Sequence, residues 1–409
     1  MTFEAIKRRV LFVDDEAEIL HGLRCTLRKQ RKSWDMHFAV GGEDALRFLE
    51  QEQVDAIVTD MRMPGMDGAE LLAEARRLAP GACRLILSGQ TDAAMALRAL
   101  PVAHQFLHKP CEREEIVAAV DRKCGVRDLL HDADLQRLVV ETKALPSPAT
   151  SRSQLAHALT NPLFGHSEIA ACIQRDAALS AKFLQLANSA FFSLPHVVVE
   201  VSEAIALLGI PTIEHVIESG EVFENMPVDT LLQGQAPEEF QRTNFAVSLL
   251  SARIAEECGM NTRVARTAGL LHDLGVLALA QARPARSAAA WVRALDEHIT
   301  FSEAEEADFG ATHAALGASL LGVWGLPDTI VDAVARHHSP VRDRFDVDGV
   351  VHVANALVGD VVHKDKAPLA GHDVLDREWL AQVGHGARLP RWRELAERVV
   401  ASANQGVWG

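Results

Sequence analysis

The chain has 409 residues, of which 48% are hydrophobic and 24% are charged, and its formal net charge is −15. This length exceeds what one compact core can use and predicts two or three domains. The acidic balance argues against nucleic acid as the main binding partner, and the sequence has no apolar run near the ~20 residues of a membrane span. The six cysteines are scattered without a CxxC pair, which predicts reduced thiols in a cytoplasmic protein.

Residues 1–125 alternate apolar strands with amphipathic helices. We expect strands at Arg9–Val13, Met36–Ala39, Val54–Thr59, Arg84–Leu87 and Gln105–His108. We expect helices at Ala17–Arg28, Gly42–Glu50, Gly68–Leu78 and Glu112–Lys123, and a short, mobile one within Gln90–Ala103. This order predicts an α/β doubly wound domain with a five-stranded parallel sheet covered on both faces.

Polar side chains follow four of these strands. The first strand ends in Asp14 and Asp15, the third in Asp60 and the fourth in Ser88, and Lys109 follows the fifth. A strand-terminal Asp often only starts a turn, but parallel strands bring all four endings to one edge of the sheet. Clustered carboxylates repel one another and favour a bound Mg²⁺, and a lysine can hold phosphate oxygens. The set therefore suits phosphoryl transfer to a carboxylate.

These residues, with Met63-Pro64-Gly65-Met66-Asp67-Gly68 behind Asp60, Ser88-Gly89 and Lys109-Pro110, resemble the receiver domain of bacterial two-component response regulators. The resemblance implies that Asp60 accepts phosphate from a histidine kinase or phosphotransfer protein. It implies a Mg²⁺ site formed by Asp14, Asp15, Asp60 and the backbone carbonyl of Arg62. It also implies that the phosphate is read by Ser88, Lys109 and the aromatic switch residue Phe106.

Residues 126–146 contain no glycine and no proline before Pro146. Their apolar residues fall near one face, which predicts a helical connector. The run is too short to indicate a coiled coil, and we expect it to pack against the next domain.

Residues 147–409 are patterned as helices almost throughout, with two of them meeting near Asp176 and further helices at Glu378–Val383 and Trp392–Ala401. His272-Asp273, together with histidines on later helices, could form a metal site. Adjacent helical residues point in different directions, so a buried His–Asp pair that only fixes packing is the alternative.

This region resembles the HDOD branch of the HD superfamily of metal-dependent phosphohydrolases. The resemblance covers about residues 140–360 and depends on five motifs: Asp176 with Leu179, Leu186-Ala187-Asn188-Ser189, Ala204-Ile205 with Leu208-Gly209, Gly269-Leu270-Leu271-His272-Asp273-Leu274-Gly275, and Trp324-Gly325-Leu326-Pro327. It implies an all-α, HD-like output domain at 147–409 with a C-terminal helical extension.

Three positions depart from an active HD enzyme. The helix before His272 has no histidine around Thr243, the catalytic lysine is replaced by Val276, and the last ligand is Asn355. A dinuclear centre needs most of these ligands. We therefore expect a degenerate site that holds one transition metal or none; its residues are His272, Asp273, His313, His337 and His338.

The sequence thus predicts a response regulator in which phosphorylation of Asp60 controls a non-catalytic HDOD domain. The downstream partner would be a protein or a nucleotide, and a homodimer is left open. The alternative is a phosphorylation-gated, metal-dependent phosphodiesterase of cyclic dinucleotides. A transcription factor is disfavoured because no basic helix-turn-helix is evident.

Overall fold

The computed structural model describes residues 7–89, 98–99, 102–127, 130, 132–142, 144–188, 197–218, 224–226, 235–363 and 375–405. Most of the helix expected within Gln90–Ala103 lies outside these residues. The chain divides into two compact units, one made chiefly of residues 1–143 and the other chiefly of residues 144–409. Among the described helices, none combines the length and the apolar character that a membrane crossing requires.

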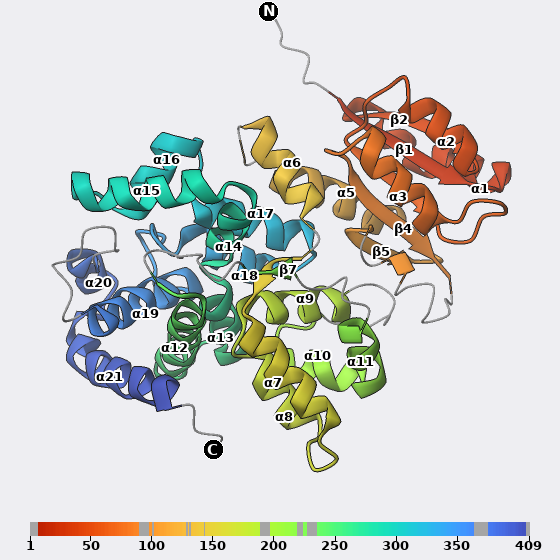
Figure 1. The fold of residues 1–409 in the computed structure, drawn as a ribbon. Coiled ribbons are helices and arrows are strands. Elements are labelled where there is room, and N and C mark those ends of the chain that lie inside the picture. Colours follow the sequence, from red (N-terminus) through yellow and green to blue (C-terminus); the bar gives the residue numbers. More distant parts are fainter. Residues whose placement is uncertain are drawn as a thin grey trace, which may run out of the picture. The chain divides into compact units, whose positions relative to one another are not determined.

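The first unit contains a five-stranded, all-parallel sheet in the order β2-β1-β3-β4-β5 (Figure 1). The strands are β1 (Arg8–Asp14), β2 (Trp34–Val40), β3 (Ala56–Asp60), β4 (Cys83–Ser88) and β5 (Gln105–His108). β1 pairs with β2 on one side and with β3 on the other, so the order reverses there. Such a reversal opens a crevice beyond the carboxyl ends of the strands, which is where Asp14 and Asp60 end β1 and β3.

Helices cover both faces of this sheet, which confirms the doubly wound fold. They are α1 (Ala17–Thr26), the 3-10 helix η1 (Leu27–Lys32), α2 (Gly42–Leu49), α3 (Gly68–Leu78) and α5 (Arg113–Arg127). Successive residues of a strand point to opposite faces. Leu11 and Val13 accordingly join the apolar cluster that contains α2 and α3 residues, whereas Val10 and Phe12 join the cluster that contains α1 and α5 residues.

The connector is not one helix. α5 ends at Arg127, and α6 (Ala133–Glu141) starts anew at Asp132, whose carboxylate accepts hydrogen bonds from two backbone N–H groups of the first turn. α6 is assigned to the first unit, and the expectation that it packs against the next domain stays a prediction. The guanidinium of the buried Arg84 donates to the carbonyl oxygen of Val140 at 2.9 Å. A buried cation requires acceptors, and the unpaired carbonyls at a helix end supply them.

The second unit is helical, apart from the short parallel pair β6 (Pro146–Ser147) and β7 (Glu224–Asn225) among its described residues. Its helices, shown in Figure 1, are α7 (Ala149–Thr160), α8 (His166–Ile173), α9 (Ala177–Ala187), α10 (Val201–Leu208), α11 (Ile210–Glu218), α12 (Pro237–Glu257), α13 (Thr262–Leu271), α14 (Leu274–Ala282), α15 (Pro284–Glu297), α16 (Phe301–Phe309), α17 (His313–Val323), α18 (Asp328–Arg336), α19 (Val347–Val362), α20 (Arg377–Gln382), the 3-10 helix η3 (Gly386–Arg388) and α21 (Leu389–Gln405).

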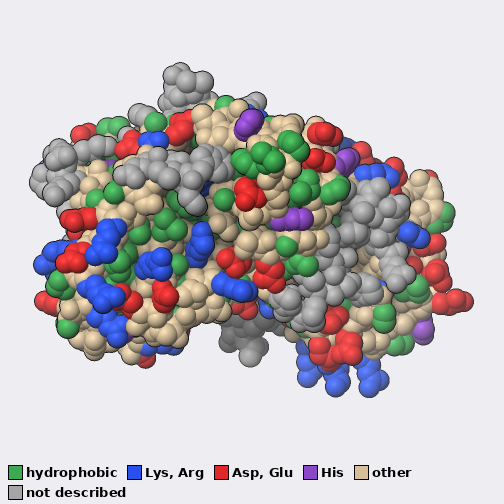
Figure 2. All heavy atoms as spheres, turned by 90° about the horizontal axis from the view of Figure 1, so that it is seen from below, with side chains coloured by type: hydrophobic (Ala, Val, Ile, Leu, Met, Phe, Trp, Pro, Cys, Tyr) green, Lys and Arg blue, Asp and Glu red, His purple; other side chains and the backbone are tan. Residues whose placement is uncertain are grey.

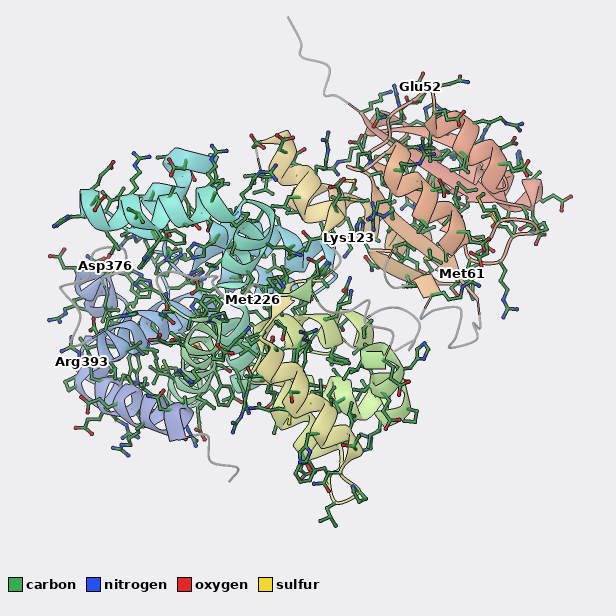
Figure 3. All side chains as sticks on the ribbon, in the orientation of Figure 1. Glu52, Met61, Lys123, Met226, Asp376 and Arg393 are labelled. Atoms are coloured by element: carbon green, nitrogen blue, oxygen red, sulfur yellow. The ribbon has the colours of Figure 1, made fainter. Side chains whose placement is uncertain are left out.

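Two sequence predictions about this unit are confirmed. α8 and α9 meet at Asp176, which caps α9 by accepting a hydrogen bond from the N–H of Leu179 at 3.0 Å. The C-terminal helices pack on the unit through Trp379 and Trp392, which lie in one buried cluster with residues of α12 and α19. Asp376, labelled in Figure 3, begins α20 by accepting from the N–H of Trp379.

Candidate functional site

The strand ends of the first unit bring two carboxylates and one ammonium group together. The Nζ atom of Lys109 lies 2.9 Å from Asp14 Oδ2 and 2.5 Å from Asp60 Oδ1. Both aspartates are buried, whereas Asp15 is exposed. Burial lowers the pKa of Lys109, but its hydrogen bonds to Asp60 and Asp14 outweigh this effect and leave that pKa above its ordinary value. Lys109 is therefore a permanent positive charge between the two carboxylates.

Backbone groups fix the remaining carboxylate oxygens. The N–H of Arg62 donates to Asp60 Oδ2 at 2.6 Å, and the N–H of Glu16 donates to Asp14 Oδ1 at 3.0 Å. The carboxylates of Asp14, Asp15 and Asp60 and the carbonyl of Arg62 are hard oxygen donors, which is the ligand class that Mg²⁺ prefers. The donor chemistry of these residues therefore fits the ion that the sequence implies.

The turn after Asp60 permits a close backbone approach. The N–H of Gly68 donates to the carbonyl of Met61 at 2.9 Å, and a Cβ atom at Gly68 would lie 2.3 Å from the carbonyl oxygen of Asp60. Only glycine avoids this clash. Met61, labelled in Figure 3, is the first residue of the turn, and Asp67 caps α3 together with Glu70. The glycine thus lets α3 start directly beside the acidic residue.

The two predicted switch residues lie on β4 and β5. The hydroxyl of Ser88 donates to the carbonyl of Gly89 at 3.1 Å, and the carbonyl of Ser88 accepts from the N–H of Lys109 at 2.7 Å. Phe106 is 3% exposed and belongs to the apolar cluster on the α2 and α3 face of the sheet. A backbone hydrogen bond therefore joins the end of β4 to Lys109, whose ammonium group contacts Asp60.

A second group of chemically active side chains lies in the second unit. His272 and Asp273 connect α13 to α14, His313 begins α17, and His337 and His338 follow α18. Asp273 Oδ1 lies 3.2 Å from His313 Nε2 and 3.6 Å from His337 Nε2. His338 Nε2 lies 2.8 Å from His313 Nε2, and His272 Nε2 lies 3.4 Å from Asp273 Oδ2. The structure thus brings together all five residues that the sequence selects.

Four members of this histidine group are buried, and His338 is partly exposed. His272, His313 and His337 are at most 1% exposed and Asp273 is 6% exposed, whereas Figure 2 shows only individual histidines at the surface of one face. Burial raises the pKa of Asp273, but His272 and His313 lower it further, so it lies well below its ordinary range. Burial lowers the pKa of His337 to about 4. Asp273 is therefore ionised and His337 is neutral near pH 7.

Comparison with known proteins identifies both units. The model of the response regulator receiver domain matches residues 10–121, and the model of the HDOD domain matches residues 145–340. The chain is a response regulator with a receiver domain and an HDOD domain.

Relatives match over parts of the chain. The transcriptional regulatory protein GlrR of Escherichia coli K12 is 33% identical over 115 residues, which are 27% of this chain and 25% of GlrR. A response regulator receiver protein of an Anaeromyxobacter species is 39% identical over 93 residues, which are 22% of this chain and 38% of that protein. The chain thus spans well under half the length of these relatives. The solved structure of the MmoQ response regulator from Methylococcus capsulatus is 22% identical, with a TM-score of 0.49, and the match covers 60% of this chain and 97% of MmoQ.

The HDOD domain departs from an active HD centre at the predicted positions. The hydroxyl of Thr243 donates to Gln235 Oε1 at 3.1 Å, and Thr243 lines a cavity of about 200 Å³ between α12, α19 and α21. Its neighbour Asn244 is fully buried, and its amide has no hydrogen-bond partner within the described part of the chain. Val276 lies buried in α14, and the amide oxygen of Asn355 lies 3.2 Å from His272 Nε2. Nε2 of His272 therefore lies next to the neutral amide of Asn355 rather than next to a second carboxylate.

One residue of the site escaped sequence reasoning. Glu305 Oε2 accepts from the backbone N–H of His313 at 2.8 Å and lies 2.5 Å from its Nδ1. In the sequence, Glu305 belongs to an acidic run on α16 that is typical of a solvated helix face. The one available signal is its short separation from His313 across the Gly310 helix end, where the chain turns back through a left-handed residue.

Proposed function

We propose that Asp60 accepts a phosphoryl group from the phosphohistidine of a histidine kinase or phosphotransfer protein. The observation that supports this most directly is the position of Lys109 Nζ, in contact with both Asp60 Oδ1 and Asp14 Oδ2. In the transfer, the P–N bond of the donor breaks as a P–O bond forms to an oxygen of Asp60, and the donor imidazole leaves and is protonated by solvent. Catalysis of this kind consists mainly of positioning and charge neutralisation.

The residues of the pocket have distinct roles. The N–H of Arg62 orients the Asp60 carboxylate, and Lys109 supplies positive charge to the phosphate. Mg²⁺, held by Asp14, Asp15, Asp60 and the carbonyl of Arg62, would neutralise further phosphate charge. The hydroxyl of Ser88 exchanges its present bond to Gly89 for a bond to phosphate oxygen.

The phosphate adds about two negative charges and three acceptor oxygens. The hydroxyl of Ser88 and the ammonium of Lys109 move toward them, and β4 and β5 carry the change to Phe106. Coupling of this kind is typically about 1–3 kcal/mol, which shifts a population without changing the fold. The HDOD domain is the non-catalytic output that binds a downstream partner. Neither family model favours the phosphodiesterase alternative.

The test is phosphorylation of the full chain by acetyl phosphate in Mg²⁺, followed on a phosphate-affinity gel. We expect a retarded band for the wild type, no such band for Asp60→Asn, and an unchanged band for Asp44→Asn, which alters a half-buried aspartate on α2. A retarded band in Asp60→Asn that matches the wild type would refute the assignment. Hydrogen exchange with and without beryllofluoride then reports whether the HDOD domain responds.

A further inference from the structure

Helix α15 has small or apolar residues on two opposite sides. It packs against α14 and α16 (Figure 1). Its buried residues are Ser287, Ala290 and Ala294. The residues on the opposite side are all exposed, and they are Ala285, Ala288, Ala289, Val292 and Leu295. At about 3.6 residues per turn, these five form one stripe along the helix, which we call the outer face of α15.

The outer face is unusually apolar for a helix at the surface. Val292 is 54% exposed and Leu295 is 39% exposed. Among the residues that the structure describes, five large hydrophobic side chains are exposed, and two of the five lie here, about one helical turn apart. A surface helix normally turns polar side chains outward, and adjoining apolar side chains in solvent mark an interaction surface. The alanines beside Val292 add little bulk, so a second helix can approach closely.

The charges along one edge of the outer face are self-complementary. Arg286 near the start of α15 and Asp296 near its end are both exposed and flank this face on the same edge. The guanidinium of Arg286 donates to the backbone carbonyl of Asp308 and lies 4.8 Å from the ring centre of Phe309, and neither of these groups is an anion. In an antiparallel pair of identical helices, the start of each helix lies beside the end of the other. Arg286 of one copy would then meet Asp296 of the second copy, and two-fold symmetry would form this pair twice.

We propose that the outer face of α15 is a homodimer interface, in which α15 of two copies packs antiparallel about a two-fold axis that passes between Ala289 and Val292. In this register Ala289 of each copy lies opposite Val292 of the other, so a small side chain meets a large one. One pair of short helices belongs to the small interfaces, which bury less than about 1,200 Å² in total, so the dimer should be weak and reversible. The proposal does not depend on phosphorylation of Asp60.

The first experiment is sedimentation velocity of the unphosphorylated full chain from about 1 µM to about 500 µM, a range that covers weak association. We expect the mass of the wild type to rise with concentration from 44.5 kDa toward twice that value. Val292→Asp should raise the dissociation constant about 10-fold or more, because two charges would lose water in the contact. The matched control is Leu163→Asp, which places the same charge on a side chain that is 88% exposed and lies outside α15. This control should dimerise like the wild type.

Charge reversal tests the antiparallel register. Arg286→Glu and Asp296→Arg should each weaken the dimer, because each places like charges opposite one another across the two-fold axis. The double variant with both substitutions restores opposite charges and should dimerise more strongly than either single variant. Damage to the fold of α15 would not be repaired by a second substitution, and the urea unfolding midpoint of each variant checks this separately.

Three results would overturn the interface. The first is a wild type that stays monomeric throughout the concentration range. The second is a dimer that is equally strong in Val292→Asp, which would place the contact on another surface. The third is a double variant weaker than both single variants. A monomeric wild type whose urea midpoint falls sharply in Val292→Asp, but not in Leu163→Asp, would show that another part of the same chain covers the outer face. Phosphate uptake by Asp60 is measured separately, so none of these results bears on the proposed function.

Discussion

The approach of α14 to α17 in the HDOD domain gives a quantitative prediction. An ideal Cβ at Gly275 would lie 2.0 Å from the carbonyl oxygen of His313 and 2.8 Å from the backbone N of Gly317. Both obstacles are backbone atoms of α17 and cannot rotate away. Since non-bonded carbon contacts are comfortable near 3.5–4.0 Å, Gly275→Ala must move α14 and α17 apart by roughly 1 Å or more.

The expected cost is set by two opposing effects. Replacing a helical glycine with alanine usually stabilises by about 0.5–1 kcal/mol, whereas overpacking costs about 1–3 kcal/mol and occasionally more. A methyl group that faces rigid backbone belongs at the upper end of the overpacking range, so we expect the free energy of unfolding to fall by about 1–3 kcal/mol in Gly275→Ala. The matched control is Gly359→Ala in α19, where the added Cβ meets nothing within 4 Å. This control should gain about 0.5–1 kcal/mol.

The assay is urea unfolding of the full chain, followed by tryptophan fluorescence, because Trp379 and Trp392 are buried in the second unit. The free-energy change is the shift in midpoint multiplied by the slope of the transition. Equal stabilities of the two variants within about 0.5 kcal/mol would refute the steric reasoning.

Three further predictions concern other parts of the chain. Burial lowers the pKa of Lys182 from 10.5 to about 8. Between pH 8 and pH 10.5 the unfolded chain therefore binds more protons than the folded chain, so the free energy of unfolding should rise over this range by up to about 3 kcal/mol. The Lys182→Met variant should lack this rise. Arg84→Met removes three hydrogen-bond donors, which bind the carbonyls of Ala82, Val102 and Val140. We expect the free energy of unfolding to fall by about 2–4 kcal/mol and the amide hydrogens of α6 to exchange faster. We expect no hydrolysis of cyclic di-GMP in Mn²⁺, with or without beryllofluoride, in a nucleotide chromatography assay.

Each of these has a contradicting result. A pH profile of Lys182→Met that matches the wild type would show that Lys182 is not the titrating group. Protection of α6 that survives Arg84→Met would show that apolar packing alone holds the helix. Turnover of cyclic di-GMP that is lost in His272→Ala would establish the phosphodiesterase alternative.

Much of the receiver domain follows from local patterns in the sequence. The limits of α3 are predicted correctly at Gly68 and Leu78 because a capping Asp and a glycine precede it and its apolar residues recur with helical spacing. The meeting of Asp14, Asp60 and Lys109 follows from topology, since parallel strands deliver their last residues to one edge. The spacing of apolar residues, the capping residues of helices and the order of strands and helices can be read from short segments of the sequence.

Other features depend on contacts between distant segments. The break that starts α6 at Asp132 and places Val140 against Arg84 reflects the need of a buried cation for acceptors, which no window of the connector reveals. Glu305 becomes a partner of His313 only because the turn at Gly310 brings the first residue of α17 back to the Glu305 side chain. The sequence by itself determined which residue types could form the two sites. Asp273 Oδ1 lies near both His313 and His337 only because helices that are far apart in the chain pack together. Side-chain atoms from distant segments come close only after the backbones that carry them have packed.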